Sequence, residues 1–251
     1  MVYKNKIPIK KSWGQNFLID PNTINNIIKL INPRKEDIIL EIGPGHGALT
    51  YELTKRCKES YAVEIDPLLC RELNKKKIDN LNLYNEDILK WDYNNKKNAK
   101  IKIAGNLPYY ISSPIIFKFL QYDYWESMTI MLQKEVAERI ISKYNTKNYS
   151  RISVMCQTFC EVKYEMNISK KSFHPIPKVD SAMIKLIKNK SDINIEDYSS
   201  LIKKSFSQRR KTLKNNLKKH VDLKNIEEYN LKRPQELTIK DYINLYKKIY
   251  I

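Results

Sequence analysis

The chain has 251 residues, of which 42% are hydrophobic, and it carries a formal net charge of +18 at neutral pH. The hydrophobic share excludes a disordered protein, and the length suits one large domain with or without a small appendage. There is no apolar run long enough to cross a membrane, and the basic N-terminus lacks the apolar stretch of a secretory signal, so we expect a cytoplasmic protein. The charge indicates an anionic partner such as nucleic acid; the alternative is lysine enrichment from an AT-rich genome.

Cysteines and histidines give no indication of a metal site. None of the four cysteines forms a Cys-x-x-Cys pair, and the three histidines are scattered along the chain. Because the spacings of known metal-ligand sets are missing, we expect reduced thiols and no bound metal.

Alternating strands and helices are predicted through residue 187. Apolar runs predict strands at 37–42, 60–65, 82–84, 101–104 and 129–132, and helices at 48–57, 67–76 and 134–142. This alternation predicts an α/β fold with a parallel sheet covered on both faces. Two further strands, 162–168 and 182–187, have no convincing helix between them and suit an antiparallel hairpin that closes the sheet.

The polar stretch 188–197 predicts a linker between a domain at residues 1–187 and a smaller helical domain at 188–251. In the second part, Thr238 and Asp241 have the spacing of a capping box at the start of an amphipathic helix.

The five glycines fall in three short segments, WGQNF, EIGPGHG and AGNLPY, and these are the candidate sites of chemistry. EIGPGHG follows a strand and precedes a helix, where Gly43 and Gly45 allow the backbone to turn tightly beside a ligand. Glu64 lies 21 residues beyond Gly43, at the end of the next strand with Ile65, and suits a carboxylate that accepts hydrogen bonds from ribose hydroxyls. The Gly-x-Gly-x-Gly spacing after an acidic residue favours S-adenosylmethionine; a nicotinamide oxidoreductase is the alternative.

Asp87 and Ile88 follow the third of these strands. We expect Asp87 to accept from the adenine amino group of the cofactor and Ile88 to lie beside the ring. The alternative for Asp87 is a turn or a helix cap, which is common for this residue type.

The segment Asn106-Leu107-Pro108-Tyr109 follows the strand at 101–104, so it lies where open α/β sheets bind ligands. An adenine amino nitrogen is a poor nucleophile because its lone pair is delocalised into the ring. The side-chain oxygen of Asn106 and the backbone carbonyl of Leu107 or Pro108 can accept its two hydrogens, and Tyr109 offers a face for stacking of the base. The alternative is a structural turn with a capping Asn.

These residues resemble the rRNA adenine N6,N6-dimethyltransferases, specifically the bacterial KsgA/RsmA family. The resemblance covers almost the whole chain and includes KSWGQNFL from Lys11, EIGPGHGALT, GNLPYYISSPI, MLQKEVAERI and FHPIPKVDS from Phe173. It continues through FSQRRKTLKNNLK from Phe206 and RPQEL from Arg233. Tyr110 departs from the pattern, because many members have Asn there.

The resemblance implies a Rossmann-like class I S-adenosylmethionine-dependent methyltransferase, with a mostly parallel seven-stranded sheet, an antiparallel final hairpin and a small all-α C-terminal domain. Its implied activity is methylation of N6 of two adjacent adenosines in the 3′-terminal hairpin of 16S small-subunit rRNA, on the immature 30S subunit, by a monomer that releases S-adenosylhomocysteine. It also implies that Asn16 and Leu18 contact the cofactor together with Asn106, and that Phe173 stacks on the target base opposite Tyr109. Alternatives are a large-subunit rRNA adenine N6-methyltransferase of the macrolide-resistance type and a non-catalytic ribosome assembly factor.

Residues 201–220 carry eight basic side chains and no acidic one. A solvated helix face in a lysine-rich protein usually mixes both signs, so this segment is predicted to bind rRNA phosphates. The predicted RNA-binding residues are Lys203, Lys204, Arg209, Arg210, Lys211 and Lys214.

Overall fold

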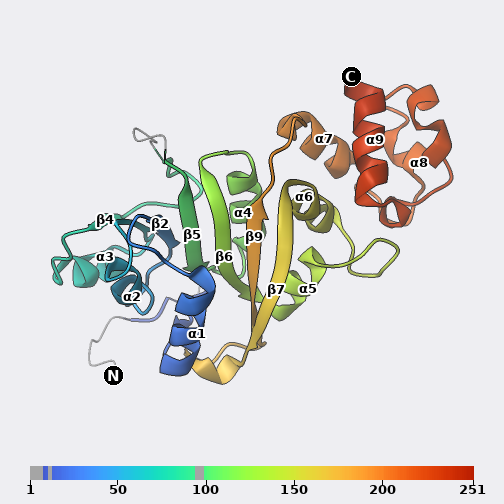
Figure 1. Ribbon diagram of the computed structural model, residues 1–251. Coiled ribbons are helices and arrows are strands. Elements are labelled where there is room, and N and C mark those ends of the chain that lie inside the picture. Colours follow the sequence, from blue (N-terminus) through green and yellow to red (C-terminus); the bar gives the residue numbers. More distant parts are fainter. Residues whose placement is uncertain (1–7, 11–12, 94–98) are drawn as a thin grey trace. The chain divides into compact units, whose positions relative to one another are not determined.

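The computed structural model describes residues 8–10, 13–93 and 99–251. At its centre is a seven-stranded sheet with the order β4-β3-β2-β5-β6-β9-β7 (Figure 1). The pairs β3–β4, β2–β3, β2–β5 and β5–β6 are parallel, and β9 lies antiparallel between β6 and β7. The strands of this sheet are β2 (Ile38–Ile42), β3 (Glu59–Val63), β4 (Leu81–Tyr84), β5 (Ile101–Asn106), β6 (Trp125–Gln133), β7 (Cys160–Ile168) and β9 (Ser181–Lys188).

The helices lie in the connections between strands and in the C-terminal part of the chain. The α-helices are α1 (Pro21–Ile31), α2 (Thr50–Thr54), α3 (Pro67–Asn74), α4 (Ser112–Leu120), α5 (Lys134–Ile140), α6 (Arg151–Phe159), α7 (Ile195–Ser205), α8 (Leu213–Leu217) and α9 (Ile239–Tyr250). Short 3-10 helices are η2 (Lys170–Ser172), η3 (Leu223–Tyr229) and η4 (Pro234–Glu236). A separate two-stranded sheet joins β1 (Phe17–Leu18) to β8 (Phe173–His174).

The predicted α/β fold, its closing antiparallel strands and the capping box at Thr238 are confirmed, while several element boundaries differ. The strand predicted at 101–104 continues through Gly105 and Asn106, because these residues still pair with Ile130 and Met131 of β6. The helix predicted at 48–57 is shorter, since turns of the glycine loop precede Thr50.

Three helices, α1, α4 and α6, are missing from the sequence prediction. The start of α1 nevertheless has a clear local cause, because Asp20 accepts hydrogen bonds from the N–H groups of Asn22 and Thr23 and Pro21 occupies the first turn. The same Asp-Pro pair, at Asp66 and Pro67, begins α3. In the predicted linker, α7 already begins at Ile195, because Asn194 caps it.

One face of the sheet packs against α1 and α2 and forms a hydrophobic core. Ile39 of β2, Ala104 of β5 and Met131 of β6 belong to one buried cluster with Ile27 of α1 and Leu53 of α2. All five residues of β2 are buried, as expected for a central parallel strand.

The chain divides into two compact units. Unit 1 comprises residues 1–134 and 164–186, and unit 2 comprises residues 135–163 and 187–251. Unit 2 includes α6 because this helix packs on α7: the Phe159 and Tyr198 rings are 5.6 Å apart edge to face, and the Thr158 and Tyr198 hydroxyls are 2.9 Å apart. The predicted division into a domain at residues 1–187 and a helical domain at 188–251 stays a prediction.

The basic segment of unit 2 is not one continuous helix. It runs from α7 through a turn to α8, because the side-chain amide of Asn216 donates to the carbonyls of Ser205 at 2.6 Å and Gln208 at 3.1 Å. This buried amide therefore fixes the shape of the turn that carries Arg209 and Arg210.

Among the described residues, no helix combines the length and the apolar character that crossing a membrane requires. In the same residues, no group of three or more His, Cys, Asp or Glu side chains is arranged to hold a metal ion. All four cysteines are free and buried.

Gly105 in β5 has no room for a side chain. A Cβ atom there would lie 2.5 Å from the carbonyl oxygen of Ile42, whereas a Cβ at Gly43 would meet only the Asn106 carbonyl, at 3.9 Å. We expect Gly105→Ala to lower the free energy of unfolding by roughly 2–3 kcal/mol, because a backbone atom must move. Gly43→Ala is the control and costs about 1 kcal/mol through its positive φ alone. Urea denaturation of both variants measures the difference, and equal losses would contradict the steric argument.

Candidate functional site

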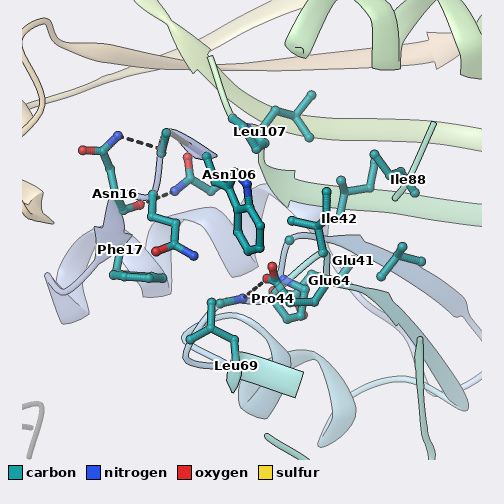
Figure 2. Close-up of a pocket in the computed structure, with 18 of the residues that line it drawn as sticks. Asn16, Phe17, Glu41, Ile42, Pro44, Glu64, Leu69, Ile88, Asn106 and Leu107 are labelled. Atoms are coloured by element: carbon teal, nitrogen blue, oxygen red, sulfur yellow. Dashed lines mark hydrogen bonds between the residues drawn. The ribbon is translucent and has the colours of Figure 1, made fainter. Parts of the chain in front are cut away.

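A pocket lies where the carboxyl ends of β2, β3 and β5 meet the loop after β4. Its walls come from five stretches of unit 1 (Figure 2). They are the N-terminal segment 13–18, residues 41–46, 48 and 49 of the glycine loop, residues 63–65 with 69, the segment 86–88, and residues 106–111.

The glycine loop turns back over the end of β2. Gly43, Gly45 and Gly47 all have positive φ, and the N–H of Gly43 donates to the carbonyl of Val63 at 2.9 Å. The side chain of Phe17 fills the space that a Cβ on Gly45 would take, at 3.1 Å, and its ring centroid lies 4.3 Å from that of His46. The loop and the N-terminal segment therefore pack directly against each other.

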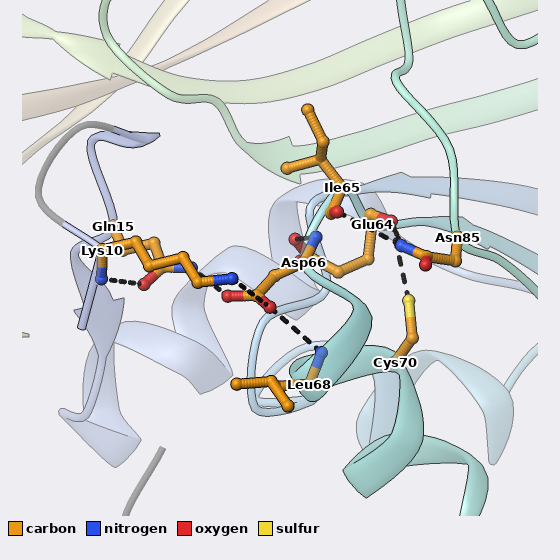
Figure 3. A network of polar contacts seen from close by, with 8 residues as sticks. All are labelled: Lys10, Gln15, Glu64, Ile65, Asp66, Leu68, Cys70 and Asn85. Atoms are coloured by element: carbon orange, nitrogen blue, oxygen red, sulfur yellow. Dashed lines mark hydrogen bonds and ion pairs between the residues drawn. The ribbon is translucent and has the colours of Figure 1, made fainter. Parts of the chain in front are cut away.

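Glu64 is fixed at the floor of the pocket by backbone groups. Its Oε2 accepts from the N–H of Gly45 at 3.1 Å (Figure 2). Its Oε1 accepts from the N–H of Asp66 at 3.0 Å (Figure 3). The side chain is buried, and burial raises the pKa of this carboxyl above its usual value. Since each carboxylate oxygen has two lone pairs, Glu64 retains acceptor capacity toward a ligand.

Glu41, at the end of β2, is a second buried acid on the pocket wall and was not among the predicted site residues. Burial raises its pKa to about 7 against the opposing effect of the Thr50 hydroxyl, and the negative charge of Glu64 acts in the same direction as burial. Its place as the first residue of EIGPGHG was the available sequence signal. The pocket therefore presents two acidic groups that are costly to ionise without a cation.

Asp87 and Ile88 line the opposite wall. One carboxylate oxygen of Asp87 accepts from the N–H of Leu89 at 2.9 Å, which is the turn contact considered as the alternative, and the residue also faces the pocket. Ile88 is buried, and Lys118 of α4 donates to its carbonyl at 2.9 Å.

Asn106 is joined to the N-terminal segment. Its Nδ2 donates to the carbonyl of Asn16 at 2.8 Å, and the Nδ2 of Asn16 donates to the carbonyl of Gly14 at 3.0 Å (Figure 2). Because its amide nitrogen is used in this way, the side-chain oxygen of Asn106 is the end left to accept from a ligand.

The rest of the predicted target-base segment is also held in place. The N–H of Leu107 donates to the carbonyl of Met131 at 3.2 Å, and the carbonyl of Pro108 accepts from the N–H of Ile111 at 3.1 Å. The Tyr109 hydroxyl lies 2.8 Å from that of Ser181 at the start of β9, and burial raises the pKa of Tyr109.

Leu18 and Ile65 line the pocket with the other predicted cofactor residues, whereas Phe173 does not. Phe173 is 1% exposed, pairs with Leu18 across the two-stranded sheet and belongs to the core cluster. In this structure its ring lies in the core.

The N-terminal segment is bound to the start of α3 through Asp66 (Figure 3). The carboxylate of Asp66 accepts from Lys10 Nζ at 3.0 Å and from Gln15 Nε2 at 2.9 Å, and it caps α3 through the N–H of Leu68 at 3.0 Å. Although burial opposes its ionisation, these hydrogen bonds hold the pKa of Asp66 below its usual value. Sequence reasoning missed this contact.

Lys11 and Ser12, the first residues of the motif KSWGQNFL, lie outside the described residues.

The predicted RNA-binding residues all lie on unit 2. Lys203, Arg210, Lys211 and Lys214 are exposed, and Lys204 and Arg209 are half-buried. The structure thus keeps most of these charges at the surface of that unit.

Strand order, glycine loop and buried acid after β3 together define a Rossmann-like class I methyltransferase. The sequence matches the family described as ribosomal RNA adenine dimethylase over residues 7–249, and the chain belongs to this family. As a member, it is a methyltransferase of adenine in ribosomal RNA.

Known relatives match along nearly their full length. The chain is 42% identical to the ribosomal RNA small subunit methyltransferase A of Francisella tularensis subsp. novicida, covering 98% of each chain. It is 40% identical to the protein of the same name from Coxiella burnetii, covering 96% of this chain and 97% of the relative. Among solved structures, it resembles a dimethyladenosine transferase from Plasmodium falciparum, with a TM-score of 0.81, 29% identity and coverage of 94% and 100%. It also resembles the 23S rRNA methyltransferase ErmE, with a TM-score of 0.72, 26% identity and coverage of 93% and 99%.

The raised pKa of Glu41 gives the stability of the ligand-free protein a specific pH dependence. Because the folded state binds this proton more tightly than the unfolded state, the stabilisation is full below the ordinary value of 4.5 and is lost as the pH rises to about 7. Between about pH 5 and about pH 8 we expect the wild type to lose roughly 2–3 kcal/mol of unfolding free energy that Glu41→Gln keeps.

Urea denaturation at both pH values measures this difference, with Glu227→Gln as a control at an exposed carboxyl. The same pH dependence in the wild type and in Glu41→Gln would show that Glu41 does not titrate in this range.

Proposed function

We propose that this chain transfers methyl groups from S-adenosylmethionine to N6 of two adjacent adenosines in the 3′-terminal hairpin of 16S small-subunit rRNA. The observation that carries the proposal is the Asn106–Asn16 hydrogen bond, which aims an amide oxygen from the end of β5 beside a nucleotide-type pocket. Support for the small subunit comes from the names of relatives 40–42% identical over nearly the whole chain.

The residues present fit S-adenosylmethionine. In this proposal Glu64 accepts from the ribose hydroxyls, Asp87 and Ile88 hold the adenine, and the backbone at Gly43 and Gly45 approaches the ligand closely. Further cofactor contacts come from Asn16, Leu18, Ile65 and Asn106. When bound, the cofactor supplies a methyl group on a positively charged sulfur. The two buried acids Glu41 and Glu64 suit a ligand that carries positive charge.

In the same proposal the target adenine lies against the segment 106–109. The Asn106 side-chain oxygen accepts one hydrogen of the adenine amino group, which aims the nitrogen lone pair away from the ring plane. The second acceptor is the backbone carbonyl of Leu107 or of Pro108. The Pro108 carbonyl already accepts from the N–H of Ile111, and its second lone pair is left for the adenine. Tyr109 gives the base a stacking surface, and its contact with Ser181 holds the ring in place.

No side chain needs to act as a strong base, since the amino nitrogen loses its proton readily once it is alkylated. Catalysis then depends on alignment and preorganised acceptors. The stacking role proposed for Phe173 requires its ring to leave the core cluster, so Tyr109 is the primary stacking residue in this proposal.

We further propose that the substrate is the rRNA within the immature 30S subunit, that the enzyme acts as a monomer in the cytoplasm, and that it needs no metal. The basic residues of unit 2 neutralise phosphates of this RNA, while sequence readout is left to the target-base site.

Asn106→Ala is expected to reduce the rate of tritium transfer from labelled S-adenosylmethionine to small-subunit rRNA by roughly 100-fold or more, because an acceptor is lost at the reacting nitrogen. Asn74→Ala, at an exposed position of α3, is the matched control. Cofactor affinity is measured separately by calorimetry, because the change also removes the bond to Asn16. Full activity in Asn106→Ala would refute the catalytic role. Labelling of large rather than small subunits by the wild type would favour the resistance-type alternative.

Neutralising Arg209, Arg210 and Lys211 with Gln is expected to weaken RNA binding and to lower the slope of log affinity against log salt by about 2–3, since each phosphate contact contributes about 0.7–0.9. Lysine at positions 209 and 210 keeps the charge and serves as the control. Filter binding over a series of salt concentrations gives the slope. An unchanged slope in the glutamine variant would remove these residues from the RNA surface.

A further inference from the structure

We propose that the loop at residues 141–149 is a second RNA-contacting segment, which the C-terminal motifs of unit 2 hold next to the basic turn. The inference rests on the proposed function, because it adds a surface for the same RNA. The loop follows α5 and precedes α6, and both helices belong to unit 2.

Side chains fix the two ends of the loop. At its start, the side-chain amide of Gln157 donates to the carbonyls of Ile140 at 2.8 Å and Ser142 at 2.9 Å. At its end, Tyr149 is 1% exposed, and its ring centroid lies 6.3 Å from that of Phe206. Phe206 is the first residue of FSQRRKTLKNNLK.

The middle of the loop is bound to two C-terminal motifs. The N–H of Asn145 donates to the carbonyl of Gln235, in RPQEL, at 2.6 Å. A guanidinium nitrogen of Arg209 donates to the carbonyl of Thr146 at 2.9 Å. Both bonds use backbone groups of the loop, so they hold its main chain in place. The side chains of the neighbouring loop residues take no part in them.

The motif RPQEL thereby gains a structural role. The N–H of Arg233 donates to the carboxylate of Glu236 at 2.8 Å, and the carbonyl of Pro234 accepts from the buried hydroxyl of Tyr242 at 2.7 Å. These two bonds stabilise the turn that contains Gln235. The carbonyl of Gln235 in this turn accepts from the N–H of Asn145.

The exposed side chains of the loop have the composition of a nucleic-acid contact. Lys143 and Lys147 are exposed, and Tyr144 between them is 51% exposed. No acidic residue occurs between Glu138 and Glu161. A loop that only needs to be soluble usually mixes both signs of charge.

Cations that alternate with an aromatic ring suit a single-stranded or looped RNA, because phosphates pair with the lysines while a base stacks on the ring. Arg209 connects the two segments chemically as well. Its guanidinium has five N–H donors and gives one nitrogen to Thr146, so donors remain for a phosphate. Because the loop is ordered before binding, less conformational entropy is lost when RNA binds.

The test measures binding of naked small-subunit rRNA over a salt series, without cofactor. Lys143→Gln with Lys147→Gln is expected to weaken binding roughly 10-fold near 0.1 M salt and to lower the log–log slope by about 1.5, as loss of two phosphate contacts requires. Lys29→Gln with Lys76→Gln removes the same charge from exposed positions of unit 1 and is the matched control, with a smaller effect on both quantities.

Stacking is tested separately at Tyr144. Tyr144→Ala is expected to weaken RNA binding roughly 10-fold with the slope unchanged, whereas Tyr144→Phe keeps the aromatic face and wild-type affinity. Circular dichroism and cofactor affinity confirm that each variant is folded.

The outcomes separate this proposal from the proposed function. Loop variants that bind RNA with the affinity and slope of their control overturn the loop surface, even when the wild type methylates small-subunit rRNA. Loss of affinity and slope in the lysine variant supports the surface, as does loss of affinity alone in Tyr144→Ala, even when the wild type transfers no methyl group to that RNA and the proposed function fails. A wild type that does not bind the RNA overturns both.

Discussion

The pocket depends on one buried carboxylate that backbone N–H groups hold on both sides. Glu64 receives one N–H from the glycine loop and one from Asp66, so the ends of β2 and β3 are set by the same group. Asp66 in turn binds Lys10 and Gln15, and one residue later the carbonyl of Asn16 orients the amide of Asn106. A continuous series of polar contacts therefore links the predicted cofactor wall to the predicted target-base wall.

Much of this site was predictable because its chemistry sits at strand ends. Glycine scarcity marked three segments, and parallel strands bring their carboxyl ends to one edge of the sheet, which placed Glu64, Asp87 and Asn106 together. The contact between Lys10 and Asp66 was not predictable, because it joins residues 56 positions apart and no periodicity reports such a pair. The burial of Phe173 depends likewise on its pairing with Leu18, which lies far away in sequence.

In the fold as well, elements that depend on local sequence patterns were predictable, and those that depend on contacts between distant residues were not. Apolar runs located the central strands, because a parallel strand that is buried on both faces is a nearly continuous run of apolar residues. By contrast, α6 was missed, and it packs with the C-terminal helices although β7 and β9 lie between them in sequence. The shape of the basic segment depends on the buried amide of Asn216, and the spacing of the charges in the sequence does not report such a contact.

Burial of Glu41, together with the nearby charge of Glu64, raises its pKa to about 7, so this carboxyl can exchange a proton with solvent when a charged ligand enters the pocket. Near neutral pH, both the protonated and the ionised form of the Glu41 carboxyl are populated. A cationic ligand stabilises the carboxylate, so its binding expels a proton into solution, whereas an uncharged analogue leaves that proton in place. The heat of binding of a cationic ligand consequently depends on the ionisation enthalpy of the buffer, and that of the uncharged analogue does not.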